Sequence, residues 1–200
     1  MGAGFFNSYH LGWTRVDART LLDDLEAAGL RPAHPVTGRI VLDSQVPGAP
    51  AAGGTRSPVT RDQLLSVAGL ERLDGIGVRL WVGHDLDVLM RIRRSGHRVV
   101  AVEFGLGGLP AEERETAVHA IRATVGRASV LCIGFVVDRE GVTTGTDWDG
   151  VVVDGSAYLD GWPDAVAVRE DVASRHPQLA VMDSVAQSPW RVFGSAVLSV

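Results

Sequence analysis

The chain has 200 residues, of which 46% are apolar, and its formal net charge is −5. This composition supplies enough apolar side chains for a core and excludes a wholly disordered protein. The length fits one domain spanning residues 1–200. The acidic balance argues against a nucleic-acid-binding protein, which needs a basic patch. Arginine takes the place of lysine throughout the chain, and alanine, valine, glycine and aspartate are abundant, as is typical of a GC-rich bacterial gene.

Neither a membrane span nor a secretory signal is visible. The longest apolar runs, such as residues 130–137, are far shorter than the ~20 residues of a membrane helix. Residues 1–13 lack the charged and apolar regions of a secretory signal. We therefore expect a soluble, cytoplasmic protein that does not bind membranes. The single cysteine, Cys132, lies in an apolar run and is expected to be a buried, unreactive thiol.

The first element that the pattern predicts is a helix over residues 17–30. Asp17 is expected to cap it, Val16 and Leu21 to form a hydrophobic staple, and Gly29 to end it. A short strand over residues 38–44 follows. The Pro/Gly-rich stretch over residues 44–58 is predicted to be a flexible loop. One hypothesis is that this loop closes over a ligand-binding or catalytic cavity.

Regular elements dominate the middle of the chain. A second helix begins at Thr60, where Thr60 and Gln63 form a capping box. An antiparallel meander follows, with strands over residues 78–83, 86–92 and 98–104. A third helix begins near Pro110 and is expected to end at Gly126. A strand over residues 129–138 is apolar on both faces and is therefore predicted to be central in a sheet.

The last third of the chain is less regular. Residues 163–175 begin with strand-like alternation and continue with a helical pattern, so the sequence leaves open whether they form a strand or a helix. Residues 179–187 and 190–200 are predicted to be strands. Helices and strand blocks are unevenly distributed, which favours an α+β fold with a mainly antiparallel sheet and three to four helices packed on it.

An acidic segment with aromatic residues stands out over residues 138–162. A calcium loop of the EF-hand type is excluded, because Gly145 and Ser156 would occupy its two anchoring positions. No histidine lies nearby to complete a transition-metal set, so no metal is expected. We predict a solvated acidic surface that binds a basic protein partner, with aromatic side chains supplying contact area. Its predicted partner-binding residues are Asp147, Trp148, Asp149, Asp154, Tyr158 and Trp162.

A glycine-rich turn supports an alternative function. Strand, turn and helix follow one another over residues 99–121, as in a dinucleotide-binding unit. Gly105 and Gly107 match the first two glycines of that fingerprint, but Pro110 replaces the third, and the acid that would hold the ribose lies farther along the chain than usual. The alternative is therefore a nucleotide- or dinucleotide-binding enzyme whose cofactor-binding residues would be Gly105, Gly107, Gly108 and Asp138.

Catalytic motifs are not apparent. The chain contains neither a nucleophile elbow nor a phosphate-binding P-loop, and no nucleophile is paired with a base. His84, Asp85 and Asp87 stand together between two predicted strands, where a turn favours such residues. The sequence does not decide whether the protein is an enzyme, but it favours a non-catalytic protein with neither catalytic residues nor a cofactor.

Two short motifs suggest a family. Residues 138–141 read DREG and residues 162–164 read WPD, and they follow a strand, a helix and a second strand. In this layout, less than half of the chain resembles small immunity proteins of bacterial polymorphic-toxin systems. The resemblance implies a soluble, non-catalytic α+β protein that binds and blocks a toxin. The sequence leaves open the identity of the partner and whether the chain forms homo-oligomers.

Overall fold

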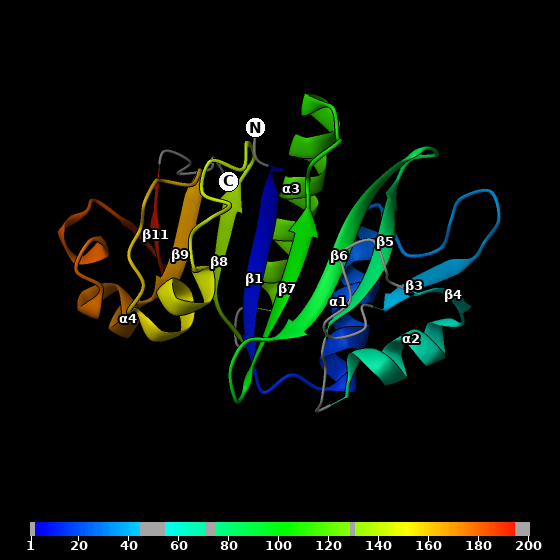
Figure 1. The fold of residues 1–200 in the computed structure, drawn as a ribbon, viewed down its shortest axis with the longest axis horizontal. Helices are drawn as coiled ribbons and strands as arrows, with labels where there is room; N and C mark the ends of the chain where they lie inside the picture. The colour runs from blue at the N-terminus through cyan, green and yellow to red at the C-terminus, as the bar shows by residue number, and fades with distance from the viewer. Residues whose placement is uncertain (1–2, 45–54, 71–74, 129–130, 195–200) are drawn as a thin grey trace.

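One antiparallel sheet organises the molecule. The computed structural model describes residues 3–44, 55–70, 75–128 and 131–194. Its strands follow the order β10-β11-β9-β8-β1-β7-β6-β5-β3-β4, and β2 pairs with β5 beside this path (Figure 1). The strands are β1 (Phe5–Leu11), β2 (Leu30–Arg31), β3 (Ile40–Ser44), β4 (Thr55–Val59), β5 (Ile76–Val82), β6 (Leu86–Arg94), β7 (Val99–Gly105), β8 (Cys132–Asp138), β9 (Ala165–Arg169), β10 (Val185–Gln187) and β11 (Trp190–Phe193).

Helical elements lie on both faces of this sheet. They are the α-helices α1 (Arg15–Ala27), α2 (Arg61–Ala68), α3 (Ala111–Arg127) and α4 (Glu170–Arg175), a π-helical segment η1 (Gly150–Asp154) and a 3-10 turn η2 (Leu179–Val181). The predicted α+β class with a mainly antiparallel sheet is thus confirmed, with more helical elements than the three to four predicted. No described helix is long and apolar enough to cross a membrane.

Strand β1 is the element that the sequence analysis missed. It lies in the middle of the sheet and pairs antiparallel with β7 on one side and β8 on the other. Its sequence, FFNSYHL, alternates between the two faces, but Asn7, Ser8 and His10 make it look too polar for a central strand. The structure accommodates these groups, since the buried Ser8 hydroxyl lies 2.9 Å from the His10 ring nitrogen Nε2.

Helices α1, α2 and α3 cover one face of the sheet and enclose the larger part of the core. Phe6 on β1 stacks on Phe135 with ring centroids 5.6 Å apart and meets the edge of Phe104 at 6.1 Å. The inward faces of α1 and α3 close over these rings (Figure 1). Leu21, Leu22 and Leu25 of α1, and Val118, Ile121 and Val125 of α3, are all buried.

The opposite face is covered over only part of its width. Segments η1, α4 and η2 lie over β8, β9 and β11, where Trp148, Val151 and Val152 join the buried side chains of those strands. Among the described residues, no helix covers the same face over β1, β7 and β6. The exposed part of this face carries the side chains that form the candidate site.

Helix ends show which local signals were informative. The capping box of Thr60 and Gln63 at the start of α2 is confirmed, with Thr60 N–H donating to Gln63 Oε1 at 2.8 Å. The predicted cap of the first helix is wrong, because Thr14 is the cap residue and Asp17 completes its capping box. The staple is also wrong, since Val16 is exposed. The third helix continues past Gly126, because the backbone of that glycine remains helical.

Three further segments differ from the predictions. Residues 55–59 form β4 and Ser44 ends β3, so the predicted loop over 44–58 is shorter than expected, and its residues 45–54 lie outside the described chain. Residues 163–175 contain both alternatives, β9 followed by α4. Residues 179–187 are not one strand, since η2 precedes the short β10. The predicted meander of β5, β6 and β7 and the central position of β8 are confirmed.

Candidate functional site

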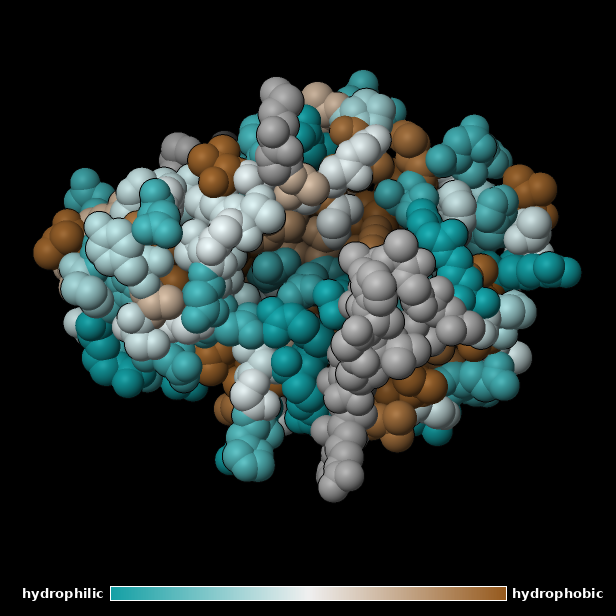
Figure 2. Space-filling model, in the orientation of Figure 1, coloured by the Kyte–Doolittle hydropathy of each residue, from teal (hydrophilic) through white to brown (hydrophobic). Residues whose placement is uncertain are grey.

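The uncovered part of the sheet is hollowed. A hollow of about 600 Å³ lies between the η1 side of the molecule and strand β6. Figure 2 shows this face hollowed near its centre, where hydrophilic and hydrophobic surface adjoin. Its floor consists of alternate residues of β1, β7 and β6, and its wall is the segment Thr144–Asp149. A space of this size is typical of sites for small molecules.

The strand register explains the shape of the hollow. Three rows of facing residues cross the sheet from β6 through β7 to β1, and in two of them the middle residue is small. The rows are Arg93–Ala101–Tyr9, Arg91–Glu103–Asn7 and Leu89–Gly105–Phe5. Because side chains alternate between faces along a strand, all of these residues share the face opposite the helices. Of the two small residues, Gly105 lines the hollow and leaves space between Leu89 and Phe5, whereas Ala101 is fully buried.

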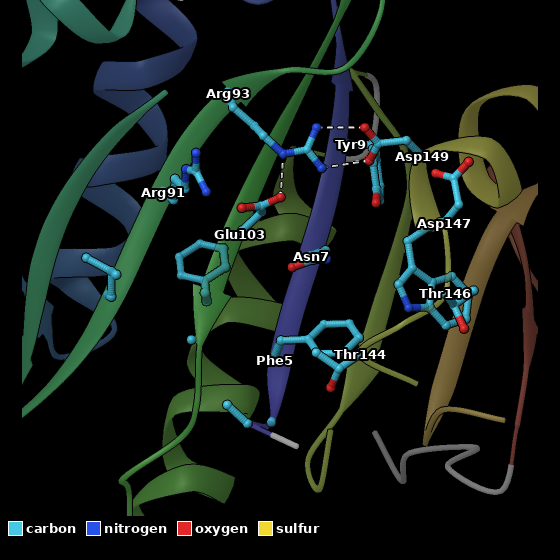
Figure 3. A pocket seen from close by; sticks show the side chains of 16 residues that line it. Phe5, Asn7, Tyr9, Arg91, Arg93, Glu103, Thr144, Thr146, Asp147 and Asp149 are labelled. Atoms are coloured by element: carbon cyan, nitrogen blue, oxygen red, sulfur yellow. Dashed lines mark hydrogen bonds and ion pairs between the residues drawn. The ribbon is translucent and has the colours of Figure 1, made fainter. Parts of the chain in front are cut away.

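Arg93 links the floor of the hollow to its wall. Its guanidinium donates two hydrogen bonds to the Asp149 carboxylate, at 2.6 and 2.8 Å, and a third to Glu103 at 2.5 Å (Figure 3). The hydrogen bonds with Asp149 outweigh the opposing effect of burial and raise the pKa of Arg93. Burial would raise the pKa of Asp149, but the hydrogen bonds from Arg93 lower it below its usual value. Arg93 and Asp149 are therefore both charged at neutral pH.

Three polar atoms in the hollow are buried and have no hydrogen-bond partner. They are the Tyr9 hydroxyl, the Trp148 indole Nε1 and the Arg91 Nε. The Tyr9 hydroxyl lies beside the carboxylate of Asp149 (Figure 3), yet its geometry does not make a hydrogen bond. Burial and the neighbouring Asp149 charge raise the pKa of Tyr9 well above its ordinary value, so the phenol stays protonated. Buried polar groups without partners are uncommon in proteins and call for an explanation.

The residues predicted to bind a partner fall into two groups. Asp147, Trp148 and Asp149 line the hollow, where Asp147 accepts a hydrogen bond from the Gly150 N–H at 3.0 Å. Trp148 is buried in the core and Asp149 is half-buried, so the prediction of a solvated surface is wrong for these two residues. Asp154, Tyr158 and Trp162 are exposed, and they do not line the hollow.

Trp162 borders a second hollow, of about 540 Å³. Val142 and Met182 supply further apolar surface there, and Glu140 and Asp183 supply carboxylates. We call these five residues the Trp162 surface: Glu140, Val142, Trp162, Met182 and Asp183. Trp162 is 44% exposed and Val142 is 73% exposed. Of the six residues predicted to bind a partner, only Trp162 belongs to this surface.

The glycine turn has a geometry that differs from a dinucleotide-binding unit. Such a unit places its two strands side by side and parallel, whereas here β1 lies between β7 and β8. The backbone at Gly107 approaches Ala3, and Gly108 adopts a positive φ of 93°. Asp138 is buried and accepts hydrogen bonds from the backbone N–H groups of Val142 and Thr143 and from the Thr143 hydroxyl. The Asp138 carboxylate therefore fixes the loop that contains Val142 and Thr143, and its oxygens are already engaged in these hydrogen bonds.

The remaining candidate groups for metal binding or catalysis are Cys132 and the turn that contains His84, Asp85 and Asp87. No cluster of three or more histidine, cysteine, aspartate or glutamate side chains that could hold a metal occurs within the described ranges. Cys132 is buried as predicted, and its burial raises the pKa of the thiol to about 12. His84 and Asp85 lie in the turn between β5 and β6, and Asp87 pairs with Arg79 at 2.7 Å.

The comparisons with known proteins provide no relative. Neither a scan against models of protein families nor searches of curated proteins and of solved structures found a match. The resemblance to immunity proteins consequently stays a prediction.

Sequence reasoning missed most of the hollow. Asn7, Tyr9, Arg91, Arg93 and Glu103 were not identified as site residues, although all of them line it. One local signal was available: Arg91 and Arg93 alternate with the apolar Met90 and Ile92, which places both arginines on one face of a strand. Both arginines lie within β6, which extends to Arg94.

Proposed function

We propose that the protein is a binding protein of the immunity type, which holds and blocks a basic protein partner through the Trp162 surface. The observation that carries this proposal is the exposure of Trp162 and Val142 next to two carboxylates around one hollow. Exposed apolar side chains rimmed by polar groups mark interaction sites. Tryptophan in particular is enriched among the residues that contribute most to protein–protein binding.

The charges around Trp162 favour a basic partner. The Asp164 carboxylate accepts a hydrogen bond from the backbone N–H of Arg139 at 2.6 Å and is held inside its own loop. Glu140 is mostly exposed and pairs with Arg114 at 3.1 Å. Asp183 is exposed and forms no ion pair within the described part of the chain. Exposed carboxylates beside an apolar contact attract positively charged partners and raise the rate of association.

The experiment is a capture assay in a GC-rich bacterial host, followed by identification of the bound protein. A photo-reactive residue at position 142 should form a crosslink to a basic protein. The double variant Glu140→Arg/Asp183→Arg should lose that crosslink, because its charge then repels the partner. Trp162→Ala should weaken capture by about thirtyfold, which corresponds to the ~2 kcal/mol of a strong interface residue.

Two control variants distinguish a loss of binding at the Trp162 surface from a loss of binding caused by misfolding. Asp85→Arg reverses an exposed charge in the β5–β6 turn, and Val36→Ala truncates an exposed apolar side chain elsewhere. Both should capture the partner like the unmodified protein and retain its circular dichroism spectrum. Capture that survives the double charge reversal, or a crosslinked partner that is acidic, would refute the proposal.

The double variant Asp147→Arg/Asp149→Arg is a poorer test. Asp149 holds Arg93 through two hydrogen bonds, so reversing its charge would disturb the floor of the first hollow. A loss of binding in that variant would not distinguish a contact with the partner from a change in the fold.

A further inference from the structure

The first hollow has unused hydrogen-bond donors at its polar end. Trp148 Nε1 and Arg91 Nε can only donate, and the protonated Tyr9 hydroxyl can donate as well. Leaving a buried donor without a partner is destabilising. Trp148 is only 5% exposed and Tyr9 is fully buried, yet both line the hollow. A molecule that offers acceptor oxygens would satisfy these groups.

Two arginines line the hollow with three carboxylates, of which Asp147 accepts a hydrogen bond from the Gly150 N–H. Arg93 is bound by Asp149 and Glu103, whose carboxylates lie on either side of its guanidinium (Figure 3). Arg91 lies directly across from Glu103 in the sheet register, but the Glu103 carboxylate bonds Arg93. Within the described residues Arg91 forms no ion pair, and its Nε has no acceptor. Arginine binds carboxylates more strongly than neutral acceptors, so Arg91 favours an anionic group.

The other end of the hollow is apolar. Phe5 and Leu89 face each other across Gly105, which has no side chain to fill the space between them. A Cβ atom added at Gly105 would meet only the Leu89 carbonyl oxygen, at 3.8 Å. Leu89 is 42% exposed on this face. The trough between Phe5 and Leu89 can therefore accept an apolar group without any rearrangement of the strands.

We propose that this hollow binds a small organic acid, with its carboxylate at Arg91, a further oxygen at Tyr9 and Trp148, and its apolar body between Phe5 and Leu89. Such a site is a ligand-binding function in addition to the partner binding proposed above. It does not depend on the Trp162 surface, because the two hollows have no lining residue in common.

The indole N–H resonances provide the test. Each of the five tryptophans contributes one indole signal to a nitrogen–proton correlation spectrum, and Trp148→Phe identifies the signal of Trp148. Phenylpyruvate and phenyllactate are the anionic probes, and their amides, phenylpyruvamide and phenyllactamide, are the neutral ones. The carboxylates should shift the Trp148 indole signal in a saturable manner, and the amides should leave it unchanged.

Two variants then locate the ligand. Arg91→Gln should weaken carboxylate binding about tenfold or more, as expected for a charged hydrogen-bonding partner. Arg98→Gln removes an exposed arginine of the β6–β7 turn and should not change the affinity. Gly105→Val should fill the trough and abolish binding, with the fold preserved because valine is favoured in strands.

Three results would overturn the proposal. They are the absence of a Trp148 shift with every carboxylate, equal binding of the amides, and an unchanged affinity in Arg91→Gln. If Gly105→Val fails to fold, Leu89→Phe is the second variant that narrows the trough, and it too should abolish binding of the phenyl acids.

Discussion

The two faces of the sheet are built on different principles, although the same strands supply both. On the helix-covered face, adjacent strands contribute Phe6, Phe104 and Phe135, whose rings pack against one another. On the other face, the same strands contribute Tyr9, Asn7 and Glu103, which form a polar floor. Apolar residues lie where a second layer covers the sheet, and polar residues lie on the face that such a layer leaves open to water.

The largest effect should come from a substitution on the covered face of β1. Phe6→Ala removes a fully buried ring and should lower the free energy of unfolding by about 4 kcal/mol, because a cavity remains. Asn7→Ala, at the adjacent position on the hollowed face, should change it by less than about 0.5 kcal/mol. Urea denaturation of both variants measures this difference, and equal losses would contradict the contrast between the faces.

The hollowed face should nevertheless contain one group with a large effect on stability. Arg93→Leu leaves the Asp149 and Glu103 carboxylates without their cation, and all three side chains are less than a third exposed. We expect a loss of about 3 kcal/mol in urea denaturation, since breaking a buried pair strands a charge. Arg79→Leu serves as the comparison, because that arginine pairs with a single acid. A loss no greater than in Arg79→Leu would show that the three-residue cluster is not stabilising.

A smaller effect is expected from His10 on the helix-covered face, which should make the free energy of unfolding depend on pH. Burial lowers the pKa of His10 to about 4, although the Asp17 carboxylate opposes this shift. Between about pH 6.5 and pH 4 the unfolded chain therefore binds a proton that the folded chain does not, so stability falls as the pH decreases. The loss should reach about 2 kcal/mol near pH 5. Denaturation of His10→Asn across this range should show a flatter dependence, and an unchanged slope would assign the effect to other groups.

Local signals were sufficient for part of the fold. The capping box of Thr60 and Gln63 involves residues three positions apart, and the alternation in β5, β6 and β7 is continuous, so both could be predicted. The strand β1 could not, because it is polar and its partner strands, β7 and β8, lie far along the chain. The side chains of Ser8 and His10 contact each other and are buried.

The candidate site was less predictable for the same reason. Arg93 and Asp149 are 56 positions apart, and neither the spacing nor the composition indicates that they meet. Gly105 was predicted to belong to a phosphate-binding turn because Gly107 and Gly108 follow it in the sequence. In the structure it forms the floor of the trough between Phe5 and Leu89. Trp148 was predicted to be exposed from its acidic neighbours, but the η1 segment folds back on β8 and buries the ring.

The position of β1 also constrains how the chain folds during its synthesis. This strand precedes every other described strand in the sequence, yet its two partners, β7 and β8, begin at Val99 and Cys132. The ribosome therefore releases β1 long before the strands that complete its hydrogen bonds. Such distant pairing makes folding slow, and an unpaired central strand invites association with other chains. The polar Asn7, Ser8 and His10 reduce that risk, because they make the nascent strand less apolar than its final position would suggest.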